Sequence, residues 1–100
     1  MSGSLPSRIA IRAPNWLGDV VLSLPAVRDI RRAFPNAKIS VVARPSVAPV
    51  YEAVPEIDAV LEVRGMRAEI AALRAGFDLA ILLPNSMGTA FLAAVAGVPE

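Results

Sequence analysis

The sequence predicts an α/β fold in which a parallel sheet carries helices on both faces. Short runs of apolar and β-branched residues alternate along the chain with segments whose apolar residues recur at helical spacing. Hydrophobic residues make up 55% of the 100 residues and charged residues 19%, which is enough apolar surface for a core. A chain of this length suits one small domain or part of a larger one.

The first two elements are a strand over residues 9–13 and a helix that starts near Val20. Pro14 ends the strand, and residues 14–19 have the composition of a turn. Apolar residues then recur at positions 20, 24, 27, 30 and 34, which predicts an amphipathic helix closed by Pro35. Pro25 lies inside this helix, where its missing N–H is expected to kink the first turns.

The remaining segments continue the alternation. Strands are predicted over residues 38–43, 59–63 and 77–83, and helices over 45–54, 66–75 and 86–96. The run at 77–83 is almost continuously apolar, which is typical of a strand buried on both faces. Because crossovers between parallel strands are right-handed, this order predicts a doubly wound, Rossmann-like sheet.

Composition excludes several classes of site and of protein. The chain has no cysteine and no histidine, so acid–base chemistry must come from carboxylates, Lys38 or Tyr51, and no metal site is expected. The first seven residues have no apolar run and are expected to be a flexible leader, not a signal peptide. The longest apolar runs are too short to cross a bilayer, so a soluble cytoplasmic chain is expected.

Charge is unevenly distributed along the chain. A net charge of +1 does not indicate a nucleic-acid partner. Residues 1–35 nevertheless hold five basic and two acidic residues, an excess of three positive charges. This excess would suit an anionic ligand, although an ordinary solvated helix face explains most of it.

In open parallel sheets, ligands bind beyond the carboxyl ends of the strands, where the strand order reverses. If the first strand is central, the loops at residues 14–19 and 84–88 flank that point. Gly18 allows a sharp turn or a close approach to a ligand. Asp19 is either the cap of the following helix or a carboxylate that takes a proton from a substrate hydroxyl.

Other polar and aromatic residues of the same edge are candidate ligand contacts. Trp16 is either a packing residue or a ring that faces a sugar, and Asn15, Asn85 and Ser86 offer amide and hydroxyl groups. Arg44 follows the second strand and could meet an anion. Neither G-x-G-x-x-G nor a Walker-type motif follows the first strand, so nicotinamide binding and P-loop chemistry are not supported.

Three segments resemble the heptosyltransferases of glycosyltransferase family 9. The first is APNWLGDVVLSLPA at 13–26, in which Gly18, Asp19 and Pro25 match the family's opening motif. The second is FPNAKI at 34–39. The third is FDLAILLPNS at 77–86, followed by AGVP at 96–99, which is most similar to the heptosyltransferase II branch.

This resemblance implies a GT-B enzyme with two Rossmann-like domains. It implies transfer of heptose from ADP-heptose to the inner core of lipopolysaccharide, with inversion and with Asp19 as the base. Asn15, Trp16, Gly18, Asn85, Ser86 and Arg44 would then contact substrate. The acceptor would be lipid A carrying Kdo and heptose, which implies peripheral contact with the inner face of the inner membrane and requires no cofactor.

The chain is shorter than the family's pattern. Residues 8–100 would form an incomplete N-terminal, acceptor-side domain, and the C-terminal domain that holds the donor is absent, so these residues alone are not expected to be active. Two alternatives stay open: another GT-B glycosyltransferase with different sugars, or a non-catalytic flavodoxin- or receiver-like binding module in which Asp19 only caps a helix. The oligomeric state is left open as well.

Overall fold

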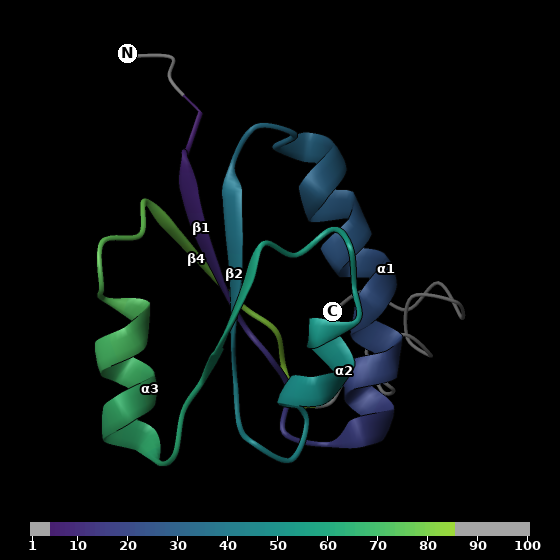
Figure 1. Ribbon diagram of the computed structural model, residues 1–100, viewed down its shortest axis with the longest axis vertical. Coiled ribbons are helices and arrows are strands. Elements are labelled where there is room, and N and C mark those ends of the chain that lie inside the picture. Colours follow the sequence, from purple (N-terminus) through teal and green to yellow (C-terminus); the bar gives the residue numbers. More distant parts are fainter. Residues whose placement is uncertain (1–4, 86–100) are drawn as a thin grey trace, which may run out of the picture.

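The computed structural model describes residues 5–85, which form strands and helices in strict alternation (Figure 1). The elements are β1 (Arg8–Arg12), α1 (Leu17–Ala33), β2 (Lys38–Ala43), α2 (Ala48–Glu52), β3 (Ala59–Glu62), α3 (Met66–Leu73) and β4 (Leu79–Leu82). The predicted order is confirmed within this range. The helix expected at 86–96 lies outside the described residues.

The four strands form one parallel sheet in the order β3-β2-β1-β4. The central strand is β1, where Ile9 pairs with Ile39 on one side and with Leu79 on the other. After β1 the chain builds the sheet outward through β2 and β3, then returns to place β4 on the opposite side of β1. The strand order therefore reverses at β1, as expected.

Helices cover both faces of the sheet, with α1 and α2 on one face and α3 on the other (Figure 1). The larger core lies under α1 and α2, where Ile9, Ile11, Ile39 and Val41 meet apolar side chains of these helices, including Val20 and Val27. Ile9 and Ile11 are fully buried. Residues alternate along a strand, so the opposite face presents Ala10, Ser40 and Val42. These smaller residues leave α3 less to pack against, and no residue of α3 is fully buried.

Three elements differ most from their predicted bounds. Helix α1 begins at Leu17, three residues before the expected start, so residues 17–19 belong to its first turn although their composition is that of a loop. Helix α2 is only five residues long, where ten were expected. The strand expected at 77–83 is reduced to Leu79–Leu82, and its predicted burial on both faces is wrong. Within the described chain β4 is an edge strand, and 57% of Leu82 is exposed.

Two aspartates anchor the amino ends of the strands. Asp58 precedes β3, and its Oδ2 accepts the amide of Ile39 at 2.8 Å and the guanidinium of Arg31 at 2.7 Å. Asp78 precedes β4, and its Oδ2 accepts the amide and hydroxyl of Ser7 and the amide of Arg8. Each carboxylate thus joins the start of one strand to the start of its neighbour.

Hydrogen bonds to the ionised form lower the pKa of both carboxyls. For Asp58 the main cause is the Ile39 amide, with Arg31 adding to it, and for Asp78 it is the bonds from Ser7. A carboxyl whose folded pKa lies below the unfolded value of about 4 stabilises the fold above that value. This stabilisation is lost as the pH falls through the folded pKa.

We therefore expect the melting temperature of the full-length protein to fall as the pH is lowered from 5 to 3, and Asp58→Asn to flatten that dependence. The variant keeps an oxygen for the Ile39 amide but loses the charge that Arg31 meets. Melting curves across this range check the prediction. A variant as steeply pH-dependent as the wild type would contradict it.

Gly65 should resist substitution for a purely conformational reason. It precedes α3 with φ +88° and ψ 164°, a region that only glycine adopts readily. A methyl group there would meet no atom within 4 Å, so Gly65→Ala isolates the backbone strain. We expect a loss of about 1–3 kcal/mol in the free energy of unfolding, measured with denaturant. A loss below about 0.5 kcal/mol would contradict the strain.

Candidate functional site at the carboxyl edge of the sheet

The loops after β1 and β4 meet at the carboxyl edge, where the strand order reverses. The amide of Asn15 donates to the side-chain oxygen of Asn85 at 2.8 Å. One guanidinium nitrogen of Arg12 donates to the carbonyl of Leu83 at 3.1 Å, and the Leu83 amide donates back to the Arg12 carbonyl at 3.0 Å. The structure therefore brings together two candidate loops that are 70 residues apart in the sequence.

Asp19 lies in the first turn of α1, but it is not the residue that caps the helix. The cap position belongs to Trp16, which is extended and forms no side-chain capping bond. The amide of Val20 donates to the carbonyl of Trp16 at 2.9 Å and closes the first turn, which places Asp19 third in the helix. The expectation that Asp19 could be a simple N-cap is wrong. A half-buried carboxylate at this position interacts favourably with the helix dipole.

Gly18 is exposed and helical, and the fold does not require a glycine there. The only described glycines with positive φ are Gly65 and Gly76, so Gly18 makes no sharp turn. A Cβ built on Gly18 meets no atom within 4 Å. The sharp turn considered from the sequence is therefore excluded, whereas the close approach of a ligand to Gly18 stays a prediction.

Trp16 stands beside Gly18 with 67% of its surface exposed. Trp16 therefore does not pack into the core of residues 5–85, and its role as a ring that faces a sugar stays a prediction. Leu17 and Val21 of the same helix end are also more than half exposed. The amino end of α1 thus combines an exposed aromatic ring, a bare backbone and a carboxylate.

Two arginines complete the edge. Arg44 directly follows β2 and is exposed, and its carbonyl accepts the amides of Val47 and Ala48 at the start of α2. Arg12 ends β1, and its Nε is buried without a hydrogen-bond partner among residues 5–85. Sequence reasoning left Arg12 unplaced, although its position before Pro14 at the end of the central strand was a usable signal. Ser86, the remaining candidate, lies outside the described residues.

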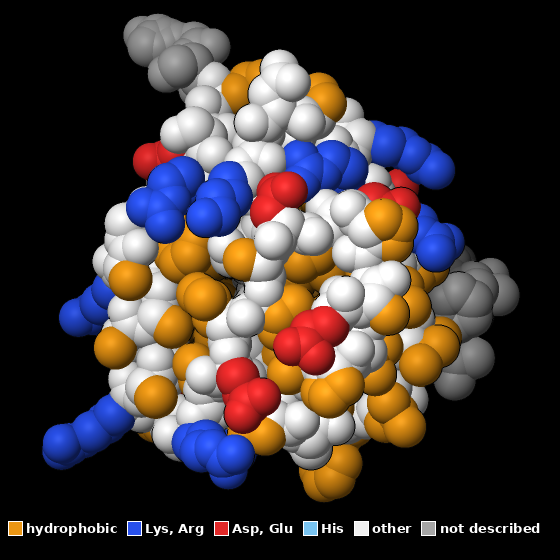
Figure 2. Space-filling view, in the orientation of Figure 1, with side chains coloured by type: hydrophobic (Ala, Val, Ile, Leu, Met, Phe, Trp, Pro, Cys, Tyr) orange, Lys and Arg blue, Asp and Glu red, His pale blue; other side chains and the backbone are white. Residues whose placement is uncertain are grey.

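The excess of basic residues in the first third of the chain does not mark this edge. Arg28, Arg31 and Arg32 lie in the last turns of α1 and pair with Glu56, Asp58 and Asp29. Figure 2 shows basic side chains as a band across the upper part of the molecule, the end at which the strands begin. The interpretation as a solvated helix face therefore holds for Arg28 and Arg32. Arg31 is mostly buried instead, and its guanidinium donates to backbone carbonyls, including those of Glu56 and Ala37.

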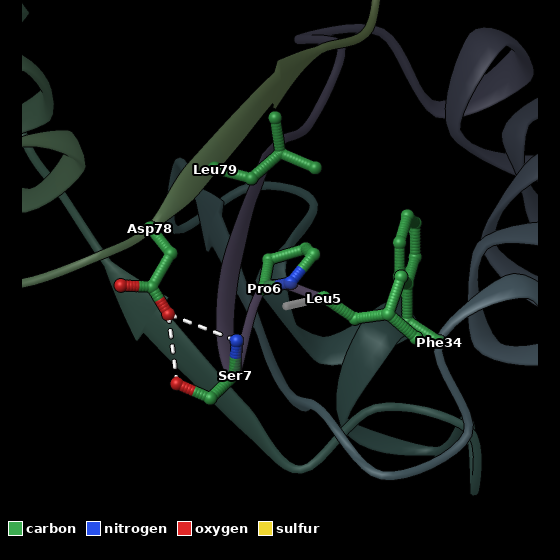
Figure 3. Close-up of a pocket in the computed structure, with 6 residues that line it drawn as sticks. All are labelled: Leu5, Pro6, Ser7, Phe34, Asp78 and Leu79. Carbon is green, nitrogen blue, oxygen red and sulfur yellow. Dashed lines mark hydrogen bonds between the residues drawn. The ribbon is translucent and has the colours of Figure 1, made fainter. Parts of the chain in front are cut away.

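A hollow in the described structure lies at the opposite, amino edge. It measures about 690 Å³ and is lined by Leu5, Pro6, Ser7, Phe34, Asp78 and Leu79. Figure 3 shows the Asp78 carboxylate turned toward Ser7 and held by two hydrogen bonds, so this carboxylate has a structural role. Among residues 5–85, no three acidic side chains come close enough together to hold a metal ion.

Comparison with known proteins identifies relatives of this chain. The lipooligosaccharide heptosyltransferase 2 of Haemophilus influenzae is 31% identical over 93 residues, and that of Haemophilus ducreyi is 33% identical over 94 residues. The Escherichia coli lipopolysaccharide heptosyltransferase 2 is 29% identical over 93% of this chain. The chain is a homologue of these heptosyltransferases. No protein-family model matches it.

Two solved structures are also similar to this chain. The structure of E. coli ADP-heptose lps heptosyltransferase II superposes with a TM-score of 0.66 and 29% identity, covering 93% of this chain and 29% of that one. The glycosyl transferase family 9 structure from Veillonella parvula gives a TM-score of 0.65 and 27% identity over 93% of this chain and 30% of that one. These matches confirm the resemblance to family 9 and the predicted fold class.

The chain spans only 27–30% of the length of these curated relatives. The matches therefore support the fold of this chain and its homology to part of the heptosyltransferases. Among the described helices, none is both long and apolar enough to cross a membrane.

Proposed function

We propose that this chain is part of a glycosyltransferase that moves heptose from ADP-heptose to the inner core of lipopolysaccharide, with Asp19 as general base. The observation that carries the proposal is the position of Asp19. Its carboxylate lies in the first turn of α1, beside the junction of the β1 and β4 loops, in a homologue of heptosyltransferases. Sheets of this topology bind their ligands at that junction.

The proposed reaction is an inverting displacement. A hydroxyl of the acceptor heptose attacks the anomeric carbon of the donor from the face opposite the ADP. The carbon–oxygen bond to the diphosphate breaks as the new glycosidic bond forms, ADP leaves with the electron pair, and Asp19 accepts the hydroxyl proton. A carboxylate is a weak base, but it suffices because the hydroxyl becomes acidic only as its oxygen bonds to the positively charged sugar carbon.

Neighbouring groups suit a polyhydroxylated, anionic acceptor. The exposed ring of Trp16 presents an apolar face of the kind that packs against a pyranose, and the bare backbone of Gly18 lets a sugar approach the first turn of α1. Asn15, Asn85 and Ser86 would contribute polar groups from the two loops. Arg12 and Arg44 supply positive charge at the same edge, where phosphates and carboxylates of the acceptor would be held.

The remaining parts of the proposal follow from the substrates. The proposal includes no cofactor besides the nucleotide-sugar donor. A lipid-linked acceptor would bring the enzyme to the cytoplasmic face of the inner membrane as a peripheral protein. The donor would be gripped by a second domain outside these 100 residues, as the share of the relatives' length suggests.

Replacing the proposed base tests the mechanism. We expect Asp19→Asn in the full-length protein to lower kcat at least about a hundredfold, because general-base catalysis contributes about 10²–10⁴-fold. Loss of the charge near the helix start should lower stability by only about 0.3–1 kcal/mol. Heptose transfer to a heptosylated Kdo–lipid A acceptor and melting temperature, both measured beside the wild type, check these values.

Different failures of this experiment have different meanings. A variant that keeps the wild-type rate would show that Asp19 is not the base, while the assignment to heptose transfer would stand. A wild-type protein that transfers no heptose from ADP-heptose would contradict the substrates, and the same assay with other nucleotide sugars would then define the donor.

Gly18 offers a second test, in which stability and activity should move in opposite directions. A methyl group on Gly18 meets no atom of the protein, and alanine favours a helix over glycine by up to about 1 kcal/mol. We therefore expect Gly18→Ala to keep or raise the melting temperature but to raise the KM for the acceptor. The strained Gly65→Ala is the matched control, since it should lower stability without changing KM. An unchanged acceptor KM in Gly18→Ala would contradict close approach of the substrate.

A further inference from the structure

A buried hydrogen-bonded chain connects α1 to α2 directly beneath the turn that carries Asp19. The Ser23 hydroxyl lies 2.6 Å from the carbonyl oxygen of Val20 and 2.8 Å from the hydroxyl of Tyr51. Ser23 and Tyr51 are both fully buried. Tyr51 belongs to α2, and this contact spans 28 residues of sequence.

The direction of the protons in this chain is fixed by its acceptor. A carbonyl can only accept, so the single hydroxyl proton of Ser23 is given to Val20. The Tyr51 hydroxyl must then be the donor to Ser23. Burial raises the pKa of Tyr51, so the phenol keeps the proton that this role requires. The order is Tyr51 to Ser23 to the backbone of Val20, the residue after Asp19.

The Ser23 hydrogen bonds lie next to the position at which α1 lacks a backbone hydrogen bond. Pro25 lies inside the helix and has no N–H, so the carbonyl of Val21 lacks the intrahelical bond that every other residue type would supply at that position. The first turn is therefore joined to the rest of α1 by one backbone bond fewer. The Ser23 hydroxyl adds a bond to the neighbouring carbonyl of Val20 and ties that turn to α2 through Tyr51.

The same contact relates two parts of the candidate site. Helix α2 begins from the turn at Arg44, whose carbonyl accepts the amides of Val47 and Ala48 at 3.0 and 2.9 Å. Asp19 is on α1, one turn before Ser23. The Tyr51–Ser23 contact therefore holds the segment after β2 against the helix that follows β1.

We propose that Tyr51, acting through Ser23, is a positioning residue that holds the first turn of α1 so that the Asp19 carboxylate meets the acceptor hydroxyl. The inference rests on the proposed role of Asp19. Neither Tyr51 nor Ser23 touches substrate. Displacing a catalytic group by about 1 Å can lower a rate about a hundredfold, so losing one hydroxyl should be visible in kcat.

The test compares Tyr51→Phe, Ser23→Ala and the double variant in the full-length protein. We expect each single change to lower kcat about 5- to 50-fold with donor and acceptor KM within about twofold, and the double variant to be little worse than either single one, because the residues act through one chain of bonds. Hydrogen exchange of the amides at 20–24 should also become faster. Ile39→Val is the matched control: it removes a buried methylene group at the far edge and should lower the melting temperature while leaving kcat unchanged.

The outcomes separate positioning from stability. If Tyr51→Phe lowers the melting temperature as Ile39→Val does but keeps the wild-type kcat, while Asp19→Asn is inactive, the residue is only structural and the proposal is overturned. If the wild type transfers no heptose, the proposed function fails by itself. Hydrogen exchange of the amides at 20–24 then tests the positioning role. If Tyr51→Phe leaves this exchange unchanged, the Tyr51–Ser23–Val20 hydrogen bonds do not hold the first turn of α1, and the proposal is overturned.

Discussion

The structure depends on β1 being paired on both sides. Its residues Ile9, Ala10 and Ile11 are completely buried, and its ladder bonds go to β2 on one side and β4 on the other. Because all these strands run parallel, every loop at their carboxyl ends opens at one edge. Everything described as a candidate site, from Asp19 to Asn85, owes its proximity to this arrangement.

The side chains at the two edges of the sheet differ in how far the fold explains them. At the amino edge, the carboxylates of Asp58 and Asp78 accept hydrogen bonds from strand amides, and the arginines of α1 pair with acidic groups. At the carboxyl edge, a glycine without a conformational task, an exposed tryptophan and a buried arginine nitrogen have no comparable structural explanation. These three features are the ones that the proposed substrate contacts would explain.

Much of this could be predicted from the sequence, for physical reasons that also set the limits. The β2 boundaries are as predicted because KISVVA is β-branched and flanked by breakers, and the first helix was visible in its apolar spacing. The start of α1 was missed because Pro14, Asn15 and Gly18 gave residues 14–19 the composition of a turn, and this hid that Asp19 is inside the helix. The partial exposure of β4 depends on which strands and helices lie beside it, and a run of apolar residues in the sequence does not reveal that. The Tyr51–Ser23 contact joins residues that are 28 positions apart, so no local sequence pattern predicts it.

The bond between Asn15 and Asn85 also bears on how the molecule is made. Contacts between segments 70 residues apart form late, because the conformational entropy of the long chain between them must be lost before the contacts can stabilise the fold. The elements β1, α1, β2 and α2 pair with near neighbours and can associate while the chain is still emerging from the ribosome. The edge that carries Asp19 is completed only when β4 docks on β1. Within residues 5–85, the candidate site is thus expected to be among the last parts to form during synthesis. A chain halted before residue 79 would have the Asp19 carboxylate but lack the loop beside it.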